Sequence, residues 1–203
     1  MFRTDPRTLL FLLPAVLIAA TCHEFAHALV ADRLGDPTAR QLGRLSLNPL
    51  VHVDPLGTLF FVLFSFGWAR PVPVNPRTFA NPRFGMLVVA LAGPLVNIVL
   101  AFAVGGIVKT QGLTGTLWGD LASMLVLINI VLAVFNLIAI PPLDGSRILE
   151  GLLPSDQALA YARIQPYGTV VILALLYTGV VGQVMSPAVR WLYGVSTGAG
   201  FHL

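Results

Sequence analysis

The sequence is poor in cysteine and in charge, and each shortage excludes a class of protein. The single cysteine, Cys22, excludes an intrachain disulfide and a metal site built from clustered cysteines. Only 10% of the residues are charged, 56% are hydrophobic, and the mean hydropathy is +0.83. Because a soluble domain does not have this composition, residues 1–203 are expected to form a single integral membrane domain.

Basic runs are also missing, which argues against nucleic acid as a partner. The net charge of +3 comes mainly from arginines that are dispersed along the chain. Basic residues beside apolar runs orient a protein in a bilayer. We therefore expect the lipid bilayer, and no nucleic acid, as a partner.

Long apolar runs are present, and they predict an all-α polytopic membrane protein with about four transmembrane helices. Glycine and proline residues separate the runs. The predicted spans cover residues 8–31, 84–108, 117–140 and about 166–186. Residues 8–150 would form the core of the domain. Trp191 and Tyr193, beyond the last span, are typical of an interfacial anchor.

The N-terminus carries Arg3 and Arg7 before an apolar run, a pattern shared with secretory signal peptides. No Ala-x-Ala cleavage site is well placed. Cleavage would also discard the polar motif of the first span or leave it at a free end. We therefore expect a retained transmembrane helix.

The connector between the first two spans has a different character. Residues 38–82 contain six of the fifteen prolines, and the apolar run Thr58–Phe66 is too short to span as a helix. Two extended runs, Gln41–Leu47 and Ala69–Val74, are flanked by turn residues. We expect them to form a small membrane-associated β-hairpin or sheet.

One polar motif lies inside the first span, roughly 20 Å from the start of that helix. It is His23-Glu24-Phe25-Ala26-His27, the H-E-x-x-H pattern of two zinc ligands and a general base. Residues four apart share a helix face, so His23 and His27 can bind one zinc ion. Glu24 points to a neighbouring side and can take a proton from a water molecule at the metal. Ionisable groups at this depth are costly, which favours chemistry over idle packing.

A catalytic zinc needs a third protein ligand and an open position. Asp144 is the best candidate, because it follows the Pro141-Pro142 break and the third span returns it to the depth of the histidines. His52, in the connector on the same side, competes for this role. A turn or helix-capping function is the alternative for Asp144.

The basic residues also predict the orientation. Eight lie in the connectors after the first and third spans, and four lie on the other side. The positive-inside rule then puts residues 32–83 and 142–165 in the cytoplasm and both termini outside. We expect a multi-pass protein of the cell membrane whose histidine pair lies nearer the cytoplasmic face.

Taken together and in this order, five groups of motifs resemble the site-2 protease family of intramembrane zinc metalloproteases, in a compact form without a PDZ or CBS domain. The matching stretches are His23–His27; Ser46–Pro49 with His52 and Asp54–Thr58; Gly67–Val74; Ala92-Gly93-Pro94 with Asn97; and Phe135–Leu137 with Pro142–Gly145. They extend over most of residues 20–150.

The resemblance implies an activity and a set of roles. One Zn²⁺ per chain would be held by His23, His27 and Asp144, with Glu24 as the catalytic base. Asn97 is implied as a candidate stabiliser of the tetrahedral intermediate, and His52 remains a lesser catalytic candidate. The substrate would be a membrane-spanning protein, cleaved within or near its transmembrane segment.

Two rival functions use the same polar residues. A non-catalytic membrane scaffold would employ them as packing contacts between helices and would bind no zinc. A metal or proton transporter needs paired repeats or further ionisable residues, and the centres of the second and fourth spans have no charge. The protease is therefore favoured, with the substrate's identity and the oligomeric state left open.

Overall fold

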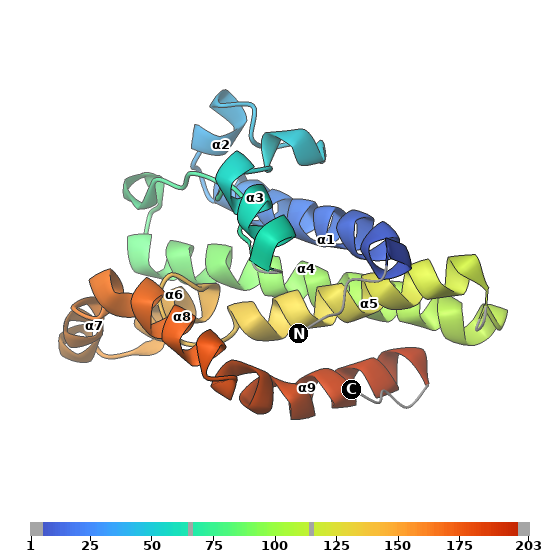
Figure 1. The fold of residues 1–203 in the computed structure, drawn as a ribbon. Helices are drawn as coiled ribbons and strands as arrows, with labels where there is room; N and C mark the ends of the chain where they lie inside the picture. Colours follow the sequence, from blue (N-terminus) through green and yellow to red (C-terminus); the bar gives the residue numbers. More distant parts are fainter. Residues whose placement is uncertain (1–5, 65–66, 114–115, 199–203) are drawn as a thin grey trace.

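The computed structural model describes residues 6–64, 67–113 and 116–198, and the regular elements in these ranges are all helical (Figure 1). In chain order the α-helices are α1 (Pro6–Arg33), α2 (Thr38–Gln41), α3 (Pro55–Phe64), α4 (Pro82–Gln111), α5 (Leu117–Asn136), α6 (Asp144–Leu152), α7 (Ser155–Ala162), α8 (Gly168–Tyr177) and α9 (Val180–Thr197). Short 3-10 helices are η1 (Pro49–Val51), η2 (Pro76–Thr78) and η3 (Gln165–Tyr167).

Four helical segments are long and apolar enough to cross a membrane, as the sequence predicts. They are Leu10–Arg33, Pro82–Gln111, Leu117–Asn136 and Ser155–Tyr177. The 30 residues of α4 measure about 45 Å, which exceeds the hydrocarbon thickness of a bilayer. The protein is therefore a multi-pass membrane protein.

Local sequence signals set the ends of α4 and α5. The Asn81 side chain accepts a hydrogen bond from the Phe84 amide at 3.1 Å, and the Thr116 hydroxyl accepts one from the Gly119 amide at 3.0 Å. These side chains satisfy N-terminal amides that have no partner within the helix. α5 ends at Asn136, a few residues before the predicted end at 140, and the chain turns into Pro141-Pro142.

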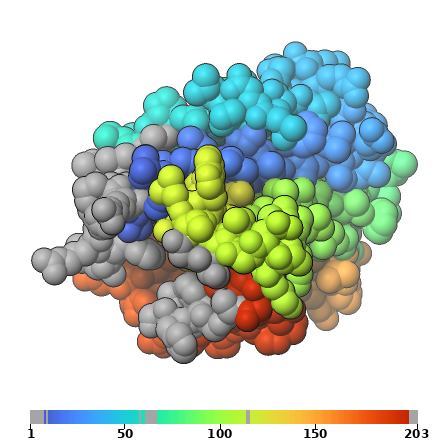
Figure 2. Space-filling view, turned by 90° about the vertical axis from the view of Figure 1, so that its right-hand side faces the viewer, coloured from blue at the N-terminus to red at the C-terminus, as the bar shows by residue number. Residues whose placement is uncertain are grey.

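The long helices form a bundle in which α1 and α9 lie on opposite sides of α4 and α5 (Figure 1). Figure 2 shows one end of this bundle, with α1 in blue above the green and yellow of α4 and α5 and α9 in red below them. Apolar side chains fill the space between α4, α5 and α9. Those buried there include Ala101, Val126, Ile130, Met185 and Val189.

The C-terminal crossing differs from the predicted span at about 166–186. α8 ends at Tyr177, and Gly179 has a φ of 77°, a left-handed conformation that interrupts the helix. α9 then continues to Thr197 along α4 and α5. Trp191 therefore lies within a packed helix, and not in a separate anchor beyond the span.

The predicted β-hairpin is wrong, because the described part of the connector contains no strand. Gln41 ends α2, and turns follow it. Residues 69–75 have no regular secondary structure, and Pro71 and Pro73 lack the amides that a β-ladder needs on that edge. The guanidinium of Arg44, and not a neighbouring strand, contacts the Arg70 carbonyl. Of the residues used above, Arg3, Ser65 and Phe66 lie outside the described ranges.

The order of the crossings leads to a labelling prediction. In a Cys22→Ser background, a single cysteine introduced by Arg40→Cys should react with an impermeant thiol reagent from one side of the membrane. Cysteines introduced by Gln111→Cys and Gly198→Cys should react from the other side, because α4 and α9 end together: Gly198 lies beside the Lys109 side chain. Labelling of position 198 from the same side as position 40 would contradict the crossing by α8 and α9.

Candidate metal centre

Two histidines of α1 and an aspartate of α6 come together inside the bundle. Nε2 of His23 lies 3.0 Å from Oδ2 of Asp144, and Nε2 of His27 lies 3.3 Å from the same oxygen. The imidazole rings are nearly perpendicular, with centroids 4.6 Å apart. The three ligand atoms all lie within 4.8 Å of one another, which is the arrangement that the sequence analysis expected.

The end of α5 positions Asp144. The chain turns at Pro141-Pro142, and α6 begins at Asp144, so the carboxylate lies at a helix N-terminus, where the helix dipole favours a negative charge. Gly145 allows this turn to pack tightly. A Cβ at Gly145 would collide with the carbonyl oxygens of Leu137 and Ile138.

Hydrogen bonds on the far side of each imidazole orient the ring. Nδ1 of His23 lies 2.6 Å from Oδ1 of Asn97, and Nδ1 of His27 lies 2.7 Å from the carbonyl oxygen of Val89. Both partners are acceptors, so each Nδ1 carries the proton and each Nε2 presents a lone pair to Asp144. Oδ2 of Asp144 is buried and accepts no hydrogen bond.

Three electron-pair donors that face one another without a proton between them fit a cation. Two imidazole nitrogens and one carboxylate oxygen are a ligand set that catalytic zinc takes in proteins, and the outer hydrogen bonds hold the rings in place. A metal ion also explains the buried, unpartnered oxygen of Asp144. The residues therefore fit zinc.

Gly93 of α4 makes room for both imidazoles. A Cβ at this position would lie 2.5 Å from Cε1 of His23 and 2.6 Å from Cε1 of His27. Such distances are well below van der Waals contact, so only glycine lets α4 approach the rings this closely. Pro94, the next residue, is buried within the same helix.

Glu24 faces the irregular segment 69–75, which we call the capping segment. Its Oε2 accepts a hydrogen bond from the Val72 amide at 2.9 Å. Because Pro71 and Pro73 have no amide hydrogen, Val72 is the only backbone donor among these three residues. The carboxylate of the predicted base is thus held by a single backbone group of the capping segment.

Two buried side chains hold the capping segment in place. Arg44 donates to the carbonyl oxygen of Arg70 at 2.6 Å, and its pKa is lowered by burial and by the charge of Arg70, whereas Glu24 raises it. Asp36, fully buried after the end of α1, accepts a hydrogen bond from the Asn75 amide at 2.6 Å. The segment is therefore anchored at both ends, on either side of Val72.

Asn97 is fully buried, and its side chain is fully engaged. Its Nδ2 donates to the Ala19 carbonyl at 3.1 Å and to Oδ1 of Asn129 at 2.7 Å, while its Oδ1 faces His23. These contacts make Asn97 a positioning residue for His23. Its role as a stabiliser of the tetrahedral intermediate stays a prediction, and would require one of these donors to be released.

His52 is not brought to the metal centre. Its Nε2 contacts the Ser46 carbonyl at 2.8 Å, and its own carbonyl accepts the Arg70 amide at 2.8 Å. The residue is buried, with an exposed fraction of 2%. Its two hydrogen bonds connect Ser46, in the connector, to Arg70 of the capping segment. Among the described residues, the histidines and acids close enough to share a metal are His23, His27 and Asp144.

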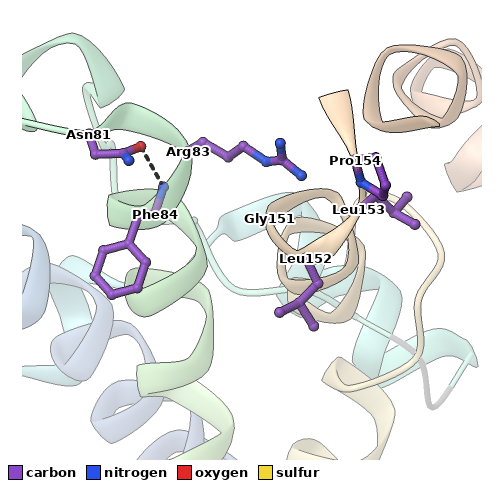
Figure 3. Close-up of a pocket in the computed structure, with 7 residues that line it drawn as sticks. All are labelled: Asn81, Arg83, Phe84, Gly151, Leu152, Leu153 and Pro154. Carbon is purple, nitrogen blue, oxygen red and sulfur yellow. Dashed lines mark hydrogen bonds between the residues drawn. The ribbon is translucent and has the colours of Figure 1, made fainter. Parts of the chain in front are cut away.

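A separate, open pocket of about 430 Å³ lies between the start of α4 and the end of α6 (Figure 3). Arg83 extends across it, and its Nε donates to the Glu150 carbonyl at 3.1 Å. The lining contains no histidine or acid. The pocket therefore lacks catalytic groups, and Arg83 fixes α6, which carries Asp144, against α4.

Several residues that shape this centre are not evident from the sequence. Gly93 is marked in the sequence, because Ala92-Gly93-Pro94 is an unusual group within a span. The sequence does not indicate that this glycine makes room for the imidazoles. Asn129 is evident as a polar residue of the third predicted span, but its partner is not, and the roles of the Val89 carbonyl and the Arg44 guanidinium have no signal in the sequence. Each acts on a residue more than 20 positions away in the chain, and no local pattern reveals such a contact.

Comparisons with known proteins agree with a metal-dependent protease. The model of the family described as Peptidase family M50 matches residues 104–179. The chain is 40% identical to "Putative zinc metalloprotease YwhC" of Bacillus subtilis (strain 168) over 187 residues, which cover 87% of this chain and 84% of that protein. It is 29% identical to "Putative zinc metalloprotease Rip2" of Mycolicibacterium smegmatis over 187 residues, 89% of this chain and 71% of the relative. No solved structure matches the chain.

The close packing of both imidazoles against Gly93 predicts that a larger residue at this position weakens metal binding. Gly93→Ala should displace both imidazoles and lower zinc affinity by roughly 10- to 100-fold, the range seen when the groups supporting metal ligands are lost. Gly106→Ala is the matched control in the same helix, because no neighbouring atom lies within 4 Å of the added Cβ. Competitive titration with a zinc chelator measures both. Equal affinities in the two variants would contradict the packing argument.

Asn97→Ala distinguishes the two roles considered for Asn97. If Asn97 positions His23, the variant should lose roughly 10-fold or more in zinc affinity as well as protease activity. A stabiliser of the intermediate alone would reduce cleavage and leave the zinc affinity unchanged. We expect the first result, measured by the same titration together with cleavage of a membrane-spanning reporter.

Proposed function

The chain belongs to peptidase family M50, the site-2 protease family, and on this premise we propose that it hydrolyses peptide bonds within or near the transmembrane segments of other membrane proteins. It is a zinc metalloprotease with several membrane-spanning helices. The observation that carries the proposal is the group of His23, His27 and Asp144 inside the helix bundle, with Glu24 on the same helix as the two histidines. A protease with its metal at this depth is suited to substrates that are themselves in the bilayer.

The proposed roles follow from the contacts of each side chain. His23, His27 and Asp144 would hold the zinc ion, and Asn97 and Val89 fix the imidazole orientations. When bound, the ion would supply a Lewis acid that lowers the pKa of a water molecule and polarises the scissile carbonyl. Glu24 accepts the proton of that water and passes it to the leaving amine.

The capping segment holds the Glu24 carboxylate. In the structure this carboxylate accepts a hydrogen bond from the Val72 amide through Oε2. A carboxylate can accept several hydrogen bonds, so Glu24 can keep this bond while it also accepts one from water. A helical substrate must also unwind locally, because its peptide bonds are engaged in i to i−4 hydrogen bonds.

We further propose that the centre lies nearer the cytoplasmic face of the cell membrane. The support is the excess of arginines in the connectors that follow α1 and α5. His23 and His27 lie in the second half of α1, towards the connector that carries many of these arginines. Water would reach the centre from that side.

Substitution of Glu24 and Asp144 tests the proposal. Glu24→Gln keeps the size of the side chain but removes the proton acceptor, so cleavage of a membrane-spanning reporter should fall by at least about a hundredfold. Because Glu24 is not a metal ligand, the variant should keep its zinc. Asp144→Ala removes a ligand, so zinc content and cleavage should both fall.

His52→Ala is the control for the competing ligand. It should keep its zinc, since His52 contacts the Ser46 carbonyl and not the metal centre. Wild-type cleavage by Glu24→Gln would refute the assignment of the base. Full zinc content in Asp144→Ala combined with loss of zinc in His52→Ala would move the third ligand to His52.

A further inference from the structure

α9 has a polar flank that its apolar packing does not use. Its polar or small residues recur every three or four positions, which places them on one side of the helix. They are Gly182, Gln183, Ser186 and Arg190, which lie within about 100° of one another around the helix axis. The buried residues of α9, among them Val181, Met185 and Val189, lie on another side and pack against α4 and α5.

The flank lies at the depth of the bilayer. α9 runs parallel to α4: a Cβ at Gly105 would lie 2.7 Å from the Ser196 carbonyl oxygen, and Gly198 is beside the Lys109 side chain. Arg190 precedes Ser196 by six residues, or about 9 Å along the helix. It is therefore level with the middle of α4, between the polar ends of that span.

The Arg190 side chain points further into the membrane. Its Nε donates to the Ser186 carbonyl at 3.3 Å and its Nη2 to the Ser186 hydroxyl at 3.1 Å. Both contacts lie one turn back, towards the N-terminus of α9 and away from the nearer membrane surface. In the described part of the chain, Arg190 forms no ion pair. An exposed arginine at this depth is costly without an acidic partner.

We propose that this flank of α9 binds a transmembrane helix of another membrane protein, which carries an aspartate or glutamate at mid-membrane depth. The carboxylate pairs with Arg190. Gly182 and Ser186, four residues apart, let the two backbones approach closely, as small residues do where membrane helices pack. No atom lies within 4 Å of a Cβ added to Gly182, so the space beside it is open.

In a second copy of this chain, α9 and the helices that pack against it do not supply the acid. Across α4, α5, α8 and α9 the one acidic residue is Asp120, in the first turn of α5. It lies near the end of the bundle, whereas Arg190 lies near its middle. A symmetric dimer in a membrane keeps each residue at its own depth, so Arg190 of one copy would not reach Asp120 of the other.

The site is remote from the metal centre, because α9 packs on the side of α4 and α5 away from α1 (Figure 1). The bound helix is therefore an anchored partner and not the segment being cut. This inference does not depend on the proposed protease function. Arg190 variants should keep wild-type zinc content and wild-type cleavage of the reporter.

Binding of synthetic helices in phosphatidylcholine vesicles tests the proposal. The full chain, with the substitutions Cys22→Ser and Gln111→Cys, carries a donor fluorophore on its one remaining thiol, and the peptide carries an acceptor. The peptide is a leucine–alanine helix of about 22 residues with aspartate, asparagine or leucine at its centre. We expect the aspartate peptide to bind at least about fivefold more tightly than the leucine peptide.

Three variants of the protein make the result specific. Arg190→Gln should abolish the preference for aspartate, and Gly182→Leu should weaken the binding of all three peptides. Arg163→Gln, which removes an exposed arginine after α7, is the matched control and should keep the preference. A preference that survives in Arg190→Gln, or is absent from the wild type, overturns the proposal. Energy transfer between copies of the protein that requires Arg190 would assign the flank to a homodimer and overturn it as well.

Discussion

The close contact between α1 and α4 at Gly93 is the constraint on which the metal centre depends. Both imidazoles lie against this one residue, where a Cβ would collide with them. The same contact brings Asn97 and the Val89 carbonyl within hydrogen-bonding distance of the two Nδ1 atoms. Since each Nδ1 then holds the proton, each Nε2 is free to bind a cation. The close contact between α1 and α4 thus fixes the tautomer of each histidine and leaves both Nε2 atoms available to a metal ion.

Segments interrupted by proline supply what regular helices do not. The turn at Pro141-Pro142 ends the path of α5 and lets α6 present Asp144 to the histidines. Pro71 and Pro73 leave the Val72 amide as the one donor between them, and it is bonded to Glu24. In both segments the proline-interrupted backbone brings a functional group to the metal centre. A continuous helix would carry that group away from the centre.

Some of this organisation could be predicted from the sequence. The H-E-x-x-H motif is local, and a helix of any length places its histidines one turn apart. The four spans were also predicted, the last with different bounds, because a bilayer requires long apolar runs. The β-hairpin was wrong for a physical reason. A run of strand-forming residues becomes a strand only if a partner strand pairs with it. Here Arg44 donates to a carbonyl of the capping segment, and Glu24 accepts from an amide of that segment.

Sequence alone is enough to predict the multi-pass helical class, the histidine pair of α1 as zinc ligands and, through the resemblance, the roles of Asp144 and Glu24. These rest on composition, on spacing within one helix and on motif order, none of which needs a tertiary contact. Only the tertiary structure decided the orientation of each imidazole, the placement of Asn97 behind His23, the hydrogen bond between Val72 and Glu24, and the depth of Arg190 on α9. Each of these features involves residues on separate segments of the chain. Their relative positions depend on how the side chains of the whole bundle pack.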